Sequence, residues 1–391
     1  MKIPSLRSSA PSWILLACGL VGCASVREDP VRVPAAAAAV ATSAEAAEQD
    51  AVESAQQDRA ADVVRIPFTL TAADNISVRA VLNGADAVDL MFHTAVDSVS
   101  MTKAAIAKLS GFKAEESVNV QSWGGTTAAR HSTGNTLQIG GLVFRDVAVT
   151  EDENSGAGTA GKFGPSLFAG RIVDVDFDAR ELVIHAWLPA KAEGYQRLDF
   201  ISRHGAMSVL GEVSVGERRL TTEFMLHTGF GGTALLDEEF VRTHELDAEL
   251  KPYGASVLKD SYGNDVKTSK VLLPGLRFGG TTFANVPVGL FPGKIGSRRT
   301  SVVGAGLLKR LNFIIDAEHR RFYVAPNALM GSPFATAGRL PRKAIAHATN
   351  HATMPMTTCT TAGTKVKNVN TRRNPASTGI SPFVISAICV S

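Results

Sequence analysis

Cysteine and acidic charge are missing from long stretches of this 391-residue chain. All four cysteines lie near the two ends, so residues 24–358 can form neither a disulfide framework nor a thiolate metal site. Residues 328–391 contain no Asp or Glu but carry seven basic residues. Removing those seven from the 40 basic residues leaves 33 against 37 acidic ones. The basic excess therefore belongs to this end segment, and we expect no nucleic acid partner.

Long apolar runs are also lacking at the N-terminal end. The apolar stretch Trp13–Val21 follows two basic residues and is too short to span a bilayer as a mature helix. It ends in Leu20-Val21-Gly22-Cys23, which resembles the bacterial lipobox, where small residues precede a lipidated cysteine. We therefore expect residues 1–22 to be a lipoprotein signal peptide that is removed before folding.

Lipidation at Cys23 would anchor the chain at a membrane surface without a spanning helix. Ala24 follows the cysteine, where Asp is the usual signal for retention in the inner membrane of bacteria. The resemblance therefore favours a place in the cell envelope, on the outer membrane and facing the periplasm. The alternatives are an ordinary signal peptide with an incidental cysteine, or lipidation at Cys18.

Two segments lack the apolar residues that a core requires. Residues 23–62 are rich in Ala, Glu, Gln, Asp and Ser, and we expect a disordered tether. Residues 328–391 are rich in Thr, Asn and Ala without periodicity, and we expect a basic, disordered tail. The folded part should therefore lie between these two segments.

Short β-rich runs fill the remainder, separated by Gly, Asn and Asp, which is typical of an all-β domain. The helical signals are brief, and the best are Thr102–Leu109 and Leu236–His244. The strand-like runs of the first half are Val64–Leu70, Ile76–Leu82, Val88–Phe92, Ser117–Gln121, Leu137–Ile139, Val143–Val149, Ile172–Phe177 and Leu182–Ile184.

The second half repeats the landmarks of the first in the same order, which indicates an internal duplication. Met91-Phe92-His93-Thr94-Ala95 matches Met225-Leu226-His227-Thr228-Gly229, and each follows an apolar strand. Ile139-Gly140-Gly141 matches Phe278-Gly279-Gly280. Gly164 precedes Asp176 by 12 residues, as Gly304 precedes Asp316. We place the first lobe at residues 63–190 and the second at residues 191–327.

This pattern resembles the two-lobed retropepsin-like and pepsin-like aspartic peptidases, in the form common among bacterial aspartyl proteases. In that family each lobe carries an apolar strand, Asp-Thr-Gly, a Gly-Gly hairpin, and two hydrophobic residues before a Gly and a short helix. The second lobe follows this order in Phe224–Thr233 and Val302–Arg310. The first lobe departs at Ala95, in the place of the motif Gly, and at Lys162. The resemblance covers about residues 64–326 and implies a duplicated acid-protease-like barrel with two pseudo-symmetric lobes and short helices.

The strongest departure is that His93 and His227 stand where the family has its catalytic aspartates. Aspartic peptidases use two carboxylates that share one proton, one activating water while the other polarises the substrate. A histidine pair supplies no carboxylate and resists double protonation. We therefore expect a pseudopeptidase, not an active aspartic endopeptidase, that binds a peptide or protein in the cleft between the lobes.

Two alternatives stay open. The two histidines could serve a different hydrolase, as a pair that holds one proton or as ligands of a metal ion. No third ligand at a useful spacing is evident, although His131 lies in the expected first-lobe flap, and we expect neither a metal nor a cofactor. The second alternative is a scaffold protein of the envelope. The sequence leaves the oligomeric state open.

Further site residues follow from the resemblance. Thr94 and Thr228 would form a hydrogen-bonded brace between the lobes, next to Gly229. Trp123 and Tyr262 lie in Gly-flanked segments where the family has flaps over the cleft. Aromatic side chains on such loops suit the capture of a strand-like ligand.

Overall fold

The computed structural model describes residues 63–110, 112, 116–122, 125–156, 158–203, 205–290 and 300–334. The expected signal peptide, Cys23, the tether, Trp123 and the tail from residue 335 onward lie outside these residues. Among the described residues, no helix is long and apolar enough to cross a membrane.

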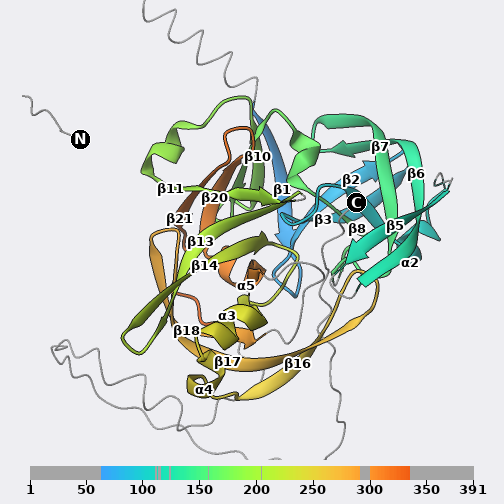
Figure 1. Cartoon of the computed structure of the whole chain (residues 1–391). Coiled ribbons are helices and arrows are strands. Elements are labelled where there is room, and N and C mark those ends of the chain that lie inside the picture. The colour runs from blue at the N-terminus through green and yellow to red at the C-terminus, as the bar shows by residue number, and fades with distance from the viewer. Residues whose placement is uncertain are drawn as a thin grey trace, which may run out of the picture. The chain divides into compact units, whose positions relative to one another are not determined.

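The first lobe is built almost wholly from short strands (Figure 1). Each β-rich run in the sequence corresponds to a strand that begins within two residues of it, except β6, which extends a predicted three-residue run to fifteen residues. In chain order the elements are β1 (Val64–Leu70), β2 (Ile76–Leu82), β3 (Asp86–Phe92), β4 (Val99–Thr102), α2 (Lys103–Ile106), β5 (Glu116–Ser122), β6 (Gly125–Ile139), β7 (Leu142–Asp152), β8 (Gly161–Phe163), η1 (Pro165–Phe168), β9 (Ile172–Asp176) and β10 (Glu181–His185). The short strands β4 and β8 and the helix η1 were not predicted.

The second lobe is likewise built mainly from strands, with η2 (Ala190–Gly194) as the connection. In chain order the elements are β11 (Gln196–Asp199), β12 (Ile201–Arg203), β13 (Ala206–Val215), β14 (Arg218–His227), β15 (Ala234–Leu236), α3 (Glu238–Thr243), α4 (Leu246–Glu249), β16 (Gly254–Lys259), β17 (Asp265–Phe278), β18 (Thr281–Leu290), β19 (Ser301–Gly304), α5 (Ala305–Leu308), β20 (Leu311–Asp316) and β21 (Arg321–Pro326). The helix α3 lies within the predicted helical segment Leu236–His244 but is shorter, and α4 was not predicted.

Strand pairing repeats from one lobe to the other. In the first lobe, β3 runs parallel to β8, β4 runs parallel to β7, and β4 is antiparallel to β8. In the second lobe, β14 with β19, β15 with β18, and β15 with β19 have the same three relations. The additional pairing of β2 with β6 likewise has a counterpart in β13 with β17. The predicted duplication is therefore confirmed, and the chain is a nearly all-β protein of two topologically equivalent lobes.

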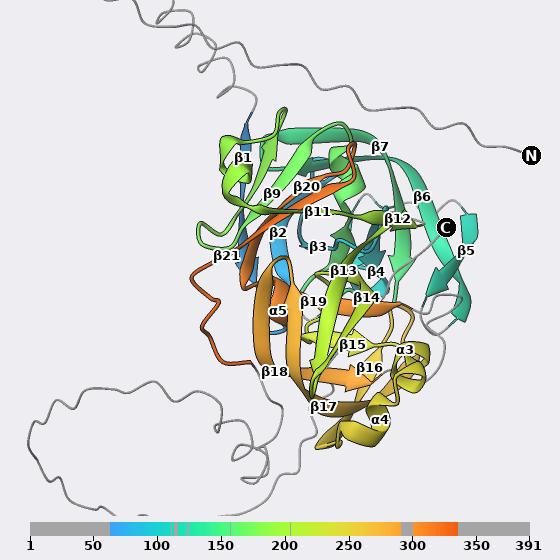
Figure 2. The same ribbon diagram turned by 60° about the vertical axis from the view of Figure 1, so that its left-hand side comes forward.

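The two lobes share one sheet at their junction, and Figure 2 shows its strands β1, β9, β11, β20 and β21 in the upper part of the molecule. Its strand order is β11-β21-β20-β9-β10-β1, so each lobe contributes three strands in mirrored sequence. The central contact pairs β20 with β9, Phe313 opposite Val175 and Ile315 opposite Val173. These four side chains are buried, and one continuous hydrophobic core extends through both lobes.

The second lobe continues beyond the predicted boundary at residue 327. The guanidinium of Arg310 donates to the carbonyls of Ser332 and Pro333, at 3.0 Å and 2.9 Å, and lies 4.1 Å from the ring centre of Phe334. The ring of Phe334 also packs against Phe283. The predicted boundary between the second lobe and the tail was therefore placed too early. Residues 332–334 are held by Arg310 through backbone carbonyls and a ring contact, and backbone contacts of this kind leave no pattern in the sequence.

Candidate functional site

Two equivalent loops position His93 and His227. His93 directly follows β3, and its amide donates to the carbonyl of Phe163 on the parallel strand β8 at 2.9 Å. His227 is the last residue of β14 and lies opposite Gly304 of the parallel strand β19. Parallel strands that have a neighbouring strand on each side are usually buried. Each histidine therefore lies in the interior of the molecule.

The two imidazoles face each other at close range, as the duplication predicted. Their ring centres lie 4.5 Å apart with planes inclined by 52°, and both side chains are 0% exposed. Gly229 makes this approach possible, because a Cβ at that position would lie 2.3 Å from Nε2 of His93. Any other residue at position 229 would therefore push the rings apart.

Thr94 and Thr228 form the predicted brace between the lobes. The hydroxyl of Thr94 donates to the carbonyl of Leu226 at 2.8 Å and accepts from the amide of Thr228 at 3.1 Å. The hydroxyl of Thr228 does the reverse, with Phe92 O at 2.7 Å and the amide of Thr94 at 3.0 Å. All four bonds are buried and reciprocal, so each loop is fixed by the other.

Burial keeps His227 uncharged. Desolvation lowers the pKa of His227 to about 3; the positive charge of Lys162 adds to this effect, and a bond to its own backbone opposes it. Nδ1 of His93 accepts a hydrogen bond from the amide of Ala95 at 3.1 Å, which leaves the proton of the neutral ring on Nε2. The site therefore holds two close, neutral imidazoles near a buried cation.

That cation belongs to a polar cluster that the sequence did not predict. The ammonium of Lys162, on β8, lies 2.6 Å from the carboxylate of Asp152, and both side chains are at most 1% exposed. Asp152 also accepts from the hydroxyl of Ser100 at 2.5 Å. The ammonium of Lys162 donates to the hydroxyl of Ser261 at 2.6 Å. The sequence signal that could have indicated this cluster is Lys162 itself, which lies in a short buried strand. Buried lysines are almost always paired with an acidic group.

The hairpin of β16 and β17 brings Ser261 to this cluster, and Figure 1 shows the hairpin extending from the second lobe toward the first. Its turn contains Asp260, Ser261 and Tyr262; the first two are buried and Tyr262 is partly buried. Beneath the turn, Leu258 joins an apolar cluster around the histidines. The buried members of this cluster are Ala95, Ala206, Met225, Phe230, Leu235, Leu258 and Val302.

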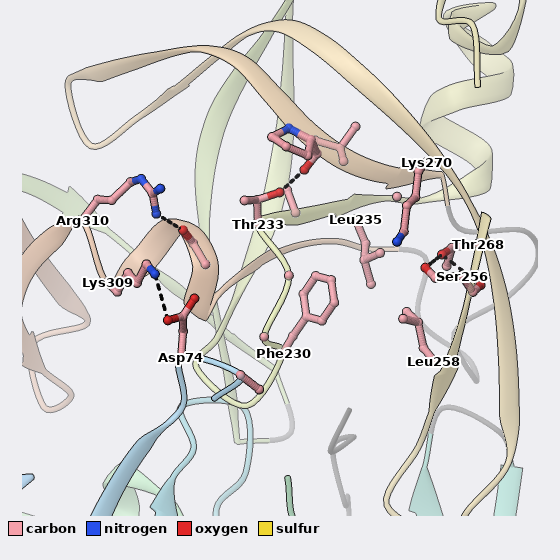
Figure 3. A pocket seen from close by; sticks show the side chains of 18 of the residues that line it. Asp74, Phe230, Thr233, Leu235, Ser256, Leu258, Thr268, Lys270, Lys309 and Arg310 are labelled. Carbon is pink, nitrogen blue, oxygen red and sulfur yellow. Dashed lines mark hydrogen bonds and ion pairs between the residues drawn. The ribbon is translucent and has the colours of Figure 1, made fainter. Parts of the chain in front are cut away.

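A cavity of about 340 Å³ lies on the second-lobe side of the site (Figure 3). Its walls include Phe230, Leu235 and Leu258, and the first lobe contributes Asp74, which pairs with Lys309 at 2.8 Å. Phe230 lines the cavity and also contacts His227 edge-on, with the two ring centres 6.4 Å apart. The cavity is within the size range of ligand pockets and is lined mainly by apolar groups.

No group of three or more potential metal ligands occurs within the part of the chain that the structure describes. His131, considered above as a third ligand, instead contacts the hydroxyl of Thr150 at 3.3 Å on the neighbouring strand β7. The described site therefore offers at most the two histidines, fewer than the three or four protein ligands of a typical zinc centre.

Parts of the chain are similar to a family model and to solved structures. Residues 78–161, from β2 to the start of β8, match a family model described as aspartyl protease. Among solved structures, the aspartic proteinase from Irpex lacteus is similar over 70% of this chain and 100% of that one, with 13% sequence identity and a TM-score of 0.49. No curated protein matches the sequence significantly. The family match in the first lobe and its topological repeat in the second define an aspartic-protease-like fold.

Proposed function

We propose that this protein is a catalytically inactive relative of the aspartic peptidases, in which His93 and His227 take the places of the catalytic aspartates. Three features support the correspondence. Each histidine ends the equivalent strand of its lobe, each precedes a threonine of the interlobe brace, and the two rings meet at the junction of the lobes. The apposition of the two rings at 4.5 Å is the observation that carries the proposal.

The chemistry of the pair argues against the aspartic-peptidase mechanism. That mechanism requires one ionised and one protonated carboxyl group around a water molecule. Two neutral imidazoles lack the negative charge that would activate the water, and protonation of His227 is suppressed until about pH 3. The apolar ring of Phe230 packs edge-on against His227, with ring centres 6.4 Å apart. The two carboxyl groups that serve as acid and base in that mechanism are thus both replaced by imidazoles.

We further propose that the protein binds a polypeptide through the cavity beside the histidines. The cavity lies between a first-lobe loop with Asp74 and the second-lobe residues Phe230 and Leu258. Its apolar walls suit a large apolar side chain, and the hydroxyls of Ser256 and Thr268 give it a polar side. Lipidation at Cys23 would place this binding domain at the periplasmic face of the outer membrane.

The catalytic part is tested with the full chain and a pool of unstructured peptides, assayed from about pH 3 to pH 8, the range in which carboxyl and imidazole groups titrate. We expect no cleavage detectable by mass spectrometry. Cleavage that a transition-state mimic of aspartic peptidases abolishes would refute the proposal. Cleavage lost with a chelator or on His93→Ala would instead favour the histidine or metal hydrolase.

The binding part is tested by filling the cavity. Ser256→Phe places a ring inside it, because Ser256 lines the wall. Val257→Phe is the matched control, since Val257 is the next residue of β16 and is 43% exposed. We expect peptides retained from the pool by the wild type to be lost with Ser256→Phe and kept with Val257→Phe. Equal retention by both variants would contradict binding in this cavity.

A further inference from the structure

The turn between β16 and β17 of the second lobe is held by the first lobe. The carbonyl of Ser261 accepts hydrogen bonds from the amides of Glu153 and Asn154, at 2.8 Å and 2.9 Å. The side-chain amide of Asn154 donates to the carbonyl of Asp260 at 3.2 Å. These contacts join residues more than 100 positions apart in the chain, so the turn crosses from one lobe to the other.

The side chain of Ser261 enters the polar cluster of the first lobe. Its hydroxyl accepts from the ammonium of Lys162, which is itself held by Asp152. Ser261, Lys162 and Asp152 are all fully buried. A buried ammonium needs every one of its hydrogen bonds to offset desolvation, so the cluster strongly favours a hydroxyl or carbonyl at this position.

The turn is also stabilised by hydrogen bonds of its own. The carboxylate of Asp260 accepts from the amides of Tyr262 and Asn264, at 3.0 Å and 2.8 Å, and from the side-chain amide of Asn264 at 2.9 Å. An Asx-type turn of this kind fixes the backbone locally. Ser261 is therefore presented with little entropic cost on docking.

We propose that this turn is an intramolecular occupant of the cleft. It fills a first-lobe site that recognises a backbone carbonyl beside a hydroxyl, and it must leave before any polypeptide reaches His93 and His227. The inference rests on the proposed function, because it states what controls access to the cleft of that inactive peptidase. A segment with a Ser or Thr residue in extended or turn conformation offers the same two groups and is the class of ligand that displaces the turn.

The test uses the full chain and no peptide, so that its outcome is separate from that of the proposed function. Ser261→Ala removes the hydroxyl from Lys162. Ser269→Ala is the matched control, because Ser269 lies on β17 of the same hairpin but is exposed and does not line the cavity. Ser261→Thr keeps the hydroxyl and should behave as the wild type.

Two rates report the opening of the turn. One is hydrogen exchange at the amides of Glu153 and Asn154. The other is modification of His93 and His227 by diethyl pyrocarbonate, resolved by peptide mass spectrometry, with His319 as an exposed internal reference. We expect Ser261→Ala to raise both rates about 10- to 100-fold, as the loss of a hydrogen bond to a charged group implies.

Wild-type rates in Ser261→Ala would overturn the proposal, as would an equal rise in Ser269→Ala. A rise that extends to the amides of β9 and β20 would also overturn it, because the turn would then support the whole fold and not the closure of the cleft. Cleavage in the peptide assay would refute the inactive site and leave these rates to decide the role of the turn.

Discussion

The two lobes use the same backbone to build opposite kinds of surface beside the histidines. In the first lobe, strand pairing sets Ser100 opposite Lys162, and this pair forms the polar cluster with Asp152. At the matching register in the second lobe, Leu235 lies opposite Val302, and both are buried in the apolar cluster. The duplicated strands therefore place these side chains at equivalent positions in the two lobes. The identity of the side chains decides whether a lobe binds the polar turn, as the first does, or forms an apolar wall, as the second does.

The buried ion pair is the largest difference between the lobes, and removing half of it should have the largest effect. Lys162→Met leaves Asp152 buried without its cation, and we expect a loss of about 3–5 kcal/mol in the free energy of unfolding. Lys162→Met combined with Asp152→Leu imitates the apolar second lobe and should recover most of that loss. Urea denaturation measures both values. If the double variant has the same free energy of unfolding as Lys162→Met, the first lobe cannot accommodate apolar side chains at these two positions.

The histidine pair should make stability depend on pH. The pKa of His227 is near its ordinary value of about 6.5 in the unfolded chain and about 3 in the fold. Because the unfolded state then binds more protons, stability is full above about pH 6.5 and falls as the pH drops toward 3, by at most about 1.4 kcal/mol per pH unit for this group. His227→Asn should flatten that part of the profile in thermal denaturation. An unchanged profile would contradict burial of a neutral ring.

The threonine brace is the most symmetric feature of the two lobes. Equivalent substitutions in it should therefore differ least in their effect on the free energy of unfolding. Thr94→Val and Thr228→Val each remove a hydroxyl that donates once and accepts once across the lobes. We expect each to cost about 1–3 kcal/mol, since buried partners lose their bonds. The two values should agree closely in urea denaturation, and the double variant should cost less than their sum because the bonds are shared. Unequal losses of unfolding free energy for Thr94→Val and Thr228→Val would show that the stability of one lobe depends more on the junction than that of the other.

Most of the fold could be predicted from the sequence because its determinants are local and repeated. Apolar alternation located the strands, and glycines at Gly140 and Gly279, with φ of 59° and 55°, marked the hairpins. Helix starts were less predictable. Thr102 and Leu236 were expected to be helical, but both pair with neighbouring strands, opposite Asp152 and Leu290. Tertiary pairing outweighs weak helix propensity in such short segments.

The candidate site was predictable only in part. The positions of His93, His227 and the two threonines follow from the duplication. The docking of Ser261 on Lys162 does not, because it joins residues 99 positions apart and depends on how one hairpin bends over the other lobe. Lys162 entered the sequence interpretation only as a departure from a motif. Its partners became visible once three strands and a turn had been brought together.

The shared sheet between the lobes has a consequence for how the chain folds. Its central strands β9 and β20 are separated by more than a hundred residues, and β21 completes the second half only at Pro326. Such long-range pairing is slow to form, and until it does, β9 presents an open edge. A nascent or truncated chain that ends before β20 would therefore leave one edge of β9 (Ile172–Asp176) open, a template for association with another copy, while β10 pairs with its other edge. The last strands to be synthesised thus protect the first lobe from aggregation.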